Sequence, residues 1–214
     1  MGVLSLRAPN VYRHGTRAAV VALWALACVA GLMALGQYEN TPGRSAEVTN
    51  QWPAGTEIVR NSAGPTLVMF AHPRCPCTRA SIAELERVVA QSGGTIHPQV
   101  VFFTPSGMSQ GWEQTDLWQS AAAIPGVEVS NDLDGSEAKR FHATTSGHTV
   151  LYDADGTLLF TGGITSARGH QGDNAGRSAV VSLLRSGTAE CRDAPVYGCP
   201  IVTSLDPSVK SLCP

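Results

Sequence analysis

The stretch that decides the fold runs from Thr66 to Ser81 and reads TLVMFAHPRCPCTRAS. Its first six residues, Thr66–Ala71, are a short unbroken apolar run, which predicts a β-strand covered on both faces. A turn with two cysteines follows, after which Cys77 or Thr78 can cap a helix that Gly93–Gly94 can end. The sequence therefore predicts a buried strand, a cysteine-containing turn and a helix, in that order.

The remainder of the chain alternates between strand and helix patterns. The expected strands are Gln99–Phe103, Val127–Val129, Thr149–Tyr152 and Thr157–Thr161, and the expected helices are Thr115–Ala123, Ser136–His142 and Asn174–Arg185. The Asp155–Gly156 pair between the last two strands favours a hairpin, and one more short strand is expected near Glu57–Arg60. This order predicts one α/β domain over residues 56–187.

An uncharged apolar segment precedes this domain. Residues 18–36 read AAVVALWALACVAGLMALG, close to the ~20 residues that a helix needs to cross a hydrocarbon core. Glu39 is the first charge after the segment, whereas three basic residues lie before it: Arg7, Arg13 and Arg17. The positive-inside rule then places residues 1–17 in the cytoplasm and exports the rest of the chain.

Two interpretations of this apolar segment stay open. As an uncleaved anchor, it predicts a single-pass protein of a bacterial inner membrane, with a linker at residues 37–55 and the domain in the periplasm. As a cleavable signal peptide, it would be removed after Ala34–Gly36, which resembles a small-x-small cleavage site. Both interpretations place the domain in an oxidising compartment, where disulfides persist.

Charge and cysteine usage narrow the classes of function. The formal net charge is −2 and no long run of Lys or Arg occurs, so there is no electrostatic reason to expect a nucleic-acid partner. Of the six cysteines, two sit one residue apart and three lie after residue 187. Such clustering indicates local thiol chemistry rather than a scaffold built from disulfides.

Cys75 and Cys77 are predicted to lie at the start of a helix, where unpaired N–H groups and the helix dipole stabilise a thiolate. Nearby basic residues add positive charge: His72, Arg74 and Arg79. We therefore expect Cys75, as the more exposed sulfur, to attack and Cys77 to resolve, with Pro76 stiffening the turn. The short Cys-Pro-Cys ring would be strained when oxidised, which favours donating or isomerising disulfides.

The predicted order of strands and helices is also that of the thioredoxin fold. Residues 131–164, NDLDGSEAKRFHATTSGHTVLYDADGTLLFTGGI, resemble a stretch of membrane-anchored thioredoxin-like proteins of the TlpA and peroxiredoxin-related group. The string HPRCPCTRAS at residues 72–81 and the later Gly198–Pro200 resemble the RedB-like subset of that group. The resemblance implies a central mixed sheet flanked by helices, no required cofactor, and thiol–disulfide exchange with exported proteins.

Two residues depart from the thioredoxin pattern. Thr78 stands where the second cysteine of a Cys-x-x-Cys motif is expected, so the motif here is Cys-x-Cys. Gly147 stands where the family has its cis-proline, beside the active site. The resemblance also implies that the loop after Gly162–Gly163 returns toward the cysteines with His170, and that His148 lies close to them.

The same residues support two other functions. Cys75 and Cys77, with His72 and His170, offer soft and borderline ligands that suit Cu(I) or Zn, as in a metallochaperone. A non-catalytic module that senses redox state or binds a partner is the other alternative, because a fold alone does not fix a function.

Residues 188–214 are expected to form a tail that a structural disulfide holds down. Cys191–Cys199 is the simplest pair in an oxidising compartment, although Cys213 can pair instead or stay free.

Overall fold

The structure is a computed structural model that describes residues 10–44 and 48–201. It divides into two compact units, Met1–Asn40 and Thr41–Pro214. Cys213, the last of the tail cysteines, lies outside the described residues.

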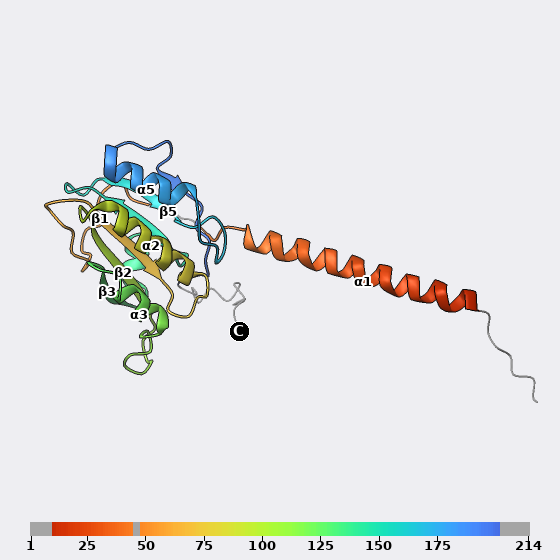
Figure 1. Cartoon of the computed structure of the whole chain (residues 1–214). Helices are drawn as coiled ribbons and strands as arrows, with labels where there is room; N and C mark the ends of the chain where they lie inside the picture. Colours follow the sequence, from red (N-terminus) through yellow and green to blue (C-terminus); the bar gives the residue numbers. More distant parts are fainter. Residues whose placement is uncertain (1–9, 45–47, 202–214) are drawn as a thin grey trace, which may run out of the picture. The chain divides into compact units, whose positions relative to one another are not determined.

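The first unit contains one long helix, α1, which spans Asn10–Glu39 (Figure 1). Its segment His14–Glu39 has a mean hydropathy of 2.4, and its most apolar part is not buried in the protein. By length and composition this helix can cross a membrane, and a signal sequence near an N-terminus meets the same criteria. The predicted span at residues 18–36 lies within it.

The second unit is built on a six-stranded sheet in the order β3-β2-β1-β4-β5-β6. The strands are β1 (Thr66–Ala71), β2 (His97–Thr104), β3 (Glu128–Leu133), β4 (His148–Tyr152), β5 (Leu158–Gly162) and β6 (Asp193–Ala194). The pairs β1–β2, β2–β3 and β5–β6 are parallel, whereas β1–β4 and β4–β5 are antiparallel. This mixed sheet, flanked by helices, is a thioredoxin-like fold, which confirms the predicted fold class.

Among the described residues of this unit, four helices accompany the sheet: α2 (Thr78–Ser92), α3 (Asp116–Ala122), α4 (Ser136–Arg140) and α5 (Ala175–Ser186). Figure 1 shows α2 and α5 side by side over one face of the sheet, and the two helices contact each other. Helix α2 ends at Gly93, whose φ of 61° is a left-handed conformation that suits glycine. The predicted end of this helix is therefore confirmed.

Strand β1 is buried along its whole length because its alternate side chains enter two different cores. Leu67 and Met69 pack with apolar side chains of α2, α3 and α5. Val68 and Phe70 pack with a second cluster on the other face, which includes Phe141. The unbroken apolar run that the sequence shows at β1 follows directly from these two cores.

The expected linker at residues 37–55 is wrong from Thr41 onward, because that part belongs to the second unit. Trp52 packs edge-on against Phe141 and Tyr152, with ring centroids 5.2 and 5.1 Å apart. Val48 is buried in the same aromatic cluster. This segment therefore covers one face of the sheet.

The short strand expected at Glu57–Arg60 does not form, which corrects the sequence analysis. The backbone amide of Glu57 donates to the Glu137 carboxylate at 3.4 Å, and the amide of Ile58 donates to the Thr56 hydroxyl at 3.1 Å. These donors have side-chain partners, so the segment does not need a neighbouring strand.

Residues 188–201 are also part of the domain, rather than a separate tail. Strand β6 extends the sheet beside β5, and the following Val196 and Ile201 are buried. The Gly43 amide donates to the Val196 carbonyl at 2.8 Å. The segments before residue 56 and after residue 187 are thus hydrogen-bonded to each other.

Candidate functional site

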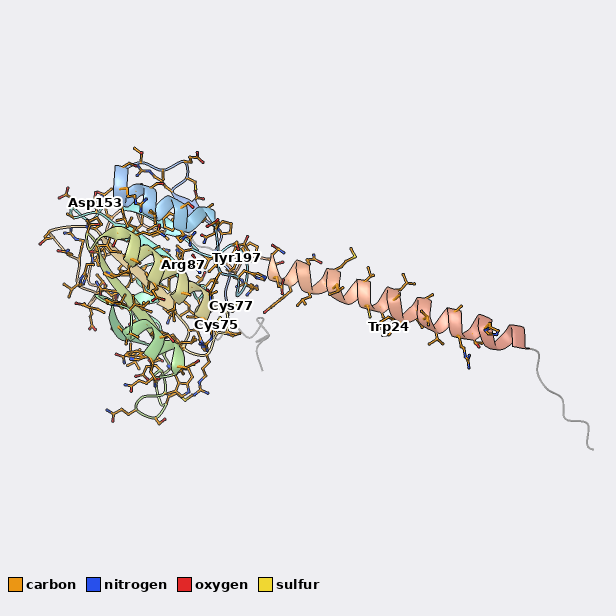
Figure 2. The ribbon with its side chains drawn as sticks, viewed as in Figure 1. Trp24, Cys75, Cys77, Arg87, Asp153 and Tyr197 are labelled. Atoms are coloured by element: carbon orange, nitrogen blue, oxygen red, sulfur yellow. The ribbon has the colours of Figure 1, made fainter. Side chains whose placement is uncertain are left out.

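The turn between β1 and α2 carries Cys75 and Cys77, which lie next to each other in Figure 2. The amide of Cys75 donates to the His72 carbonyl at 3.2 Å, and the amide of Thr78 donates to the Cys75 carbonyl at 3.1 Å. Cys77 is the N-cap of α2 and already has a helical backbone, with φ −67° and ψ −28°. Pro76 lies exposed between the two cysteines.

A third cysteine, Cys199, forms a buried cluster with Cys75 and Cys77. The Cys199 backbone amide donates to Cys75 Sγ at 3.4 Å, across a sequence separation of 124 residues. Cys75 is only 1% exposed, whereas Cys77 and Cys199 are each 9% exposed. The prediction that Cys75 is the more exposed sulfur is therefore wrong, because the segment around Cys199 packs over it.

The structure does not bring together the predicted structural pair, Cys191 and Cys199. Cys191 is half-buried and packs against the core that α2, α3 and α5 share, whereas Cys199 packs with the cysteines of the turn. Between the two cysteines the chain forms β6 at the edge of the sheet, which separates them. The pairing is thus corrected: Cys199 belongs to the candidate site.

The three thiols change one another's protonation. Hydrogen bonds with the Cys199 and Cys77 side chains lower the pKa of Cys75 far below its ordinary value, against the opposing effect of burial. The Cys199 side chain also lowers the pKa of Cys77, but the hydrogen bond with Cys75 and burial outweigh it, so that this pKa is raised. These shifts favour the thiolate form of Cys75 and the protonated form of Cys77.

The tail segment that carries Cys199 is held by backbone pairing with the residues before β4. The Ser146 amide donates to the Cys199 carbonyl at 2.8 Å, and the Ile201 amide donates to the Thr144 carbonyl at 3.0 Å. Thr145 and Pro200 form an antiparallel bridge between these two contacts. The tail thus lies against residues 144–146 through an isolated bridge and two backbone hydrogen bonds.

Arg168 fastens the same tail segment and places a positive charge near the cluster. Its guanidinium donates to the Gly198 carbonyl at 2.5 Å and to the Thr41 carbonyl at 3.2 Å. Its positive charge opposes the rise in the pKa of Cys77. Sequence reasoning missed Arg168, because it lies in an irregular loop with no motif to single it out.

The basic residues predicted beside the cysteines have their own partners. The Arg74 guanidinium lies 4.6 Å from the ring centroid of Trp112, as a cation–π contact. Arg79 forms an exposed ion pair with Asp116. The largest effects on the pKa of Cys75 come instead from the Cys199 and Cys77 side chains and from burial.

Thr78, at the position of the missing second cysteine, is fully buried and helps to hold the turn. Its hydroxyl lies 2.7 Å from that of Ser146, whose oxygen also accepts a hydrogen bond from the His72 amide at 2.8 Å. Ser146 therefore ties the end of β1 to the start of α2. No motif in the sequence indicates this role of Ser146.

Gly147, expected at the position of the thioredoxin cis-proline, follows no cis peptide bond, and none occurs in residues 10–44 or 48–201. Its φ is +90°, and a Cβ at this position would lie 2.6 Å from the Ser81 hydroxyl oxygen. The Gly147 amide donates to the Phe70 carbonyl at 2.8 Å, next to the start of the turn. Glycine is required here both by its conformation and by the closeness of α2.

The three predicted histidines have different environments. His72 is half-buried, its pKa is lowered by burial, and the negative charge of Cys75 acts in the opposite direction. His148 is 2% exposed, and burial lowers its pKa to about 4, while its Nε2 lies 2.8 Å from the Thr161 hydroxyl. His170 is exposed, with Nδ1 2.8 Å from the Arg168 carbonyl. The pKa of His72 therefore responds to the charge of Cys75.

The ligands expected for Cu(I) or Zn are Cys75, Cys77, His72 and His170. Within the part of the chain that the structure describes, no group of three or more His, Cys, Asp or Glu side chains is arranged to hold a metal ion. His72 Nδ1 accepts a hydrogen bond from the Arg74 amide at 3.2 Å. The two histidines thus both have hydrogen-bond partners within their own loops.

Comparisons with known proteins find solved structures with a similar fold. No protein-family model matches the sequence, and a search of curated proteins finds no match. A hypothetical protein, SMc02350, from Sinorhizobium meliloti 1021 has a similar structure, with a TM-score of 0.56 and 20% identity, over 73% of this chain and 96% of that one. An uncharacterized conserved protein from Geobacillus kaustophilus is similar with a TM-score of 0.54 and 18% identity, over 78% and 94% of the two chains.

The chain also has a weaker structural similarity to a protein with thioredoxin in its name. The exposed lipoprotein thioredoxin Etrx1 from Streptococcus pneumoniae strain TIGR4 gives a TM-score of 0.44 and 14% identity, over 65% of this chain and 98% of that one. At such identities, structural similarity speaks for the fold alone. The chemistry of this chain must therefore be argued from its own cysteines.

Proposed function

We propose that this protein is a thiol–disulfide oxidoreductase in which the Cys75 thiolate attacks and Cys77 resolves. The observation that carries the proposal is the contrast between the two cysteines of one strand-to-helix turn, since the pKa of Cys75 is lowered and that of Cys77 is raised. A thiolate is the nucleophile of disulfide exchange, and a neighbouring thiol can complete the reaction.

The reaction proceeds in two exchanges. Cys75 Sγ attacks one sulfur of a disulfide in an exported protein, which forms a mixed disulfide and releases the other sulfur as a thiolate that takes up a proton. Cys77 then loses its proton and attacks Cys75 Sγ, so that an internal disulfide forms and the second substrate thiol leaves. Two electrons pass from the protein to the substrate, and the same steps in reverse donate a disulfide.

Tethering by α1 is the second part of the proposal. We propose that α1 anchors the chain in a bacterial inner membrane, with the N-terminus in the cytoplasm and the cysteine cluster in the periplasm. The apolar character of His14–Glu39 and the basic residues before residue 18 support this orientation. An oxidising compartment would supply the protein disulfides that the exchange requires.

A reporter fused after Pro214 tests the orientation. It should be active only in its exported form, and the protein should stay in the membrane fraction after alkaline washing, because an apolar helix of this length partitions into lipid. The control is a fusion that lacks residues 1–39, which should stay in the cytoplasm. Activity of a cytoplasmic reporter would contradict the orientation, and a soluble form that begins near Gln37 would identify a cleaved signal peptide.

Trapping of mixed disulfides tests the assignment of Cys75. In the variant Cys77→Ser/Cys199→Ser, the attacking thiolate has no neighbouring thiol, so disulfide-linked partners should accumulate on Cys75 and be released by reductant. A Cys75→Ser variant should trap far fewer partners. Non-reducing gels and mass spectrometry measure both. If Cys75 stays unreactive toward disulfides and alkylating reagents in this variant, the non-catalytic module becomes the better account.

A further inference from the structure

We infer that Cys199 is a third redox thiol of the site, which forms a reversible disulfide with Cys75 and so resolves mixed disulfides alongside Cys77. The inference rests on the proposed function, since it assigns a second thiol that can resolve the mixed disulfide on Cys75. The C-terminal segment then takes part in disulfide exchange through Cys199, instead of being held by a structural disulfide.

The first argument is contact. Cys199 is the residue from outside the turn that lies in the cysteine cluster, and its amide donates directly to Cys75 Sγ at 3.4 Å. Both residues are buried, so that little water separates or solvates the sulfurs. A thiol held against a thiolate in this way needs only a small movement to attack when that thiolate becomes part of a mixed disulfide.

The second argument is that the tail is built to stay at this place. Backbone hydrogen bonds at Cys199 and at Ile201 fix the register of this segment against Thr144–Ser146. Arg168 holds the preceding carbonyl, that of Gly198. A Cβ on Gly198 would collide with the Ser146 carbonyl, so the close approach requires glycine at this position. These contacts lower the entropy cost of bringing a distant thiol to Cys75.

The third argument compares the two possible partners of Cys75. A Cys75–Cys77 disulfide would close a small ring across one intervening residue, and Cys77 is also fixed as the N-cap of α2. Cys199 comes from a separate segment, so its approach to Cys75 is not limited by such a ring. A disulfide with Cys199 can therefore reach relaxed geometry more readily than one with Cys77.

The proposed step balances in atoms and electrons. In the mixed disulfide between Cys75 and a substrate cysteine, the Cys199 thiol gives up its proton and its sulfur attacks Cys75 Sγ. The substrate sulfur leaves as a thiolate and takes up a proton. A Cys75–Cys199 disulfide replaces the mixed disulfide, and the two electrons from the Cys75 and Cys199 thiols have reduced the substrate disulfide.

The test uses the full chain in detergent, with glutathione as the thiol and disulfide probe. Reduced protein is equilibrated with glutathione buffers of increasing oxidised fraction, alkylated, digested and analysed for disulfide-linked peptides. The wild type should give a peptide pair joined by Cys75 and Cys199. The Cys77→Ser variant should give the same pair with little glutathione on Cys75. The Cys191→Ser variant, which alters a cysteine of the other core, should match the wild type.

A second variant moves the tail without removing its thiol. Gly198→Val in the Cys77→Ser background should displace Cys199 from the cluster, so that glutathione accumulates on Cys75 instead of the internal disulfide. Circular dichroism compares the fold of each variant with that of the wild type.

The outcomes separate this inference from the proposed function. If Cys77→Ser accumulates glutathione on Cys75 while Cys199 stays alkylated, Cys199 does not resolve and the inference is overturned, but Cys75 is still a reactive thiol. If Cys75 takes up no glutathione even in Cys77→Ser/Cys199→Ser, the proposed function fails and the inference fails with it.

Discussion

Replacing Cys75 by serine should reduce the rate of thiol–disulfide exchange to that of the protein-free reaction. Cys75 is the cysteine whose pKa the cluster lowers most clearly, and its partner in the turn has a raised pKa. A lowered pKa keeps Cys75 ionised at neutral and mildly acidic pH, and its thiolate is lost only when the pH falls through that lowered value. The wild-type rate should therefore change little over this range, whereas an ordinary cysteine would lose about tenfold per pH unit below its pKa.

The measurement is release of a coloured thiol from an aromatic disulfide by the full chain in detergent, followed at several pH values. Cys191→Ser is the matched control, because Cys191 packs in the other core and should leave the rate unchanged. A Cys75→Ser variant that keeps most of the wild-type rate would contradict the assignment of the nucleophile. A wild-type rate that falls about tenfold per pH unit from neutral pH would contradict the lowered pKa of Cys75.

Most of the fold was predictable because its signals are local. The predicted strand at Thr66–Ala71 agrees with β1, and the expected hairpin around Asp155–Gly156 joins β4 to β5. Strand β6 was not predicted, because a strand of two residues, Asp193–Ala194, is too short to show a periodic pattern. The supposed linker before residue 56 was equally unpredictable, since Trp52 finds its partners only after the sheet has formed.

The candidate site was predictable only for the residues that the motif contains. Cys75 and Cys77 are one residue apart, and the strand before them and the helix after them are both visible in the sequence. The place of Cys199 depends on hydrogen bonds between segments far apart in the chain, which spacing cannot show. Proximity in sequence instead suggested Cys191 as its partner. The exposure of Cys75 was misjudged for the same reason, because its cover comes from that distant segment.

Glu84 shows how a buried charge supports the helix that starts at the cysteine turn. It is fully buried on α2, and Arg177 of α5 donates to its Oε2 at 2.8 Å. Arg87 and the Gly172 amide donate to its Oε1 at 2.6 and 2.8 Å. A buried carboxylate is tolerated only where such partners replace water, so Glu84 joins α2 to α5 and to the loop before α5.

Arg177→Ala should therefore lower the free energy of unfolding by about 3–5 kcal/mol, because it leaves the Glu84 carboxylate buried without its main charged partner. Arg87→Ala is the matched control: it removes a second ion pair to the same carboxylate, but its side chain is 43% exposed. We expect it to cost about 0–1 kcal/mol, as exposed ion pairs do. Urea unfolding of the full chain in detergent measures both.

The double variant Glu84→Gln/Arg177→Met removes both charges and keeps an acceptor for the Gly172 amide, so it should be more stable than Arg177→Ala. Equal losses for Arg177→Ala and Arg87→Ala would show that burial of the pair does not matter, and that α2 and α5 are held by their apolar contacts alone.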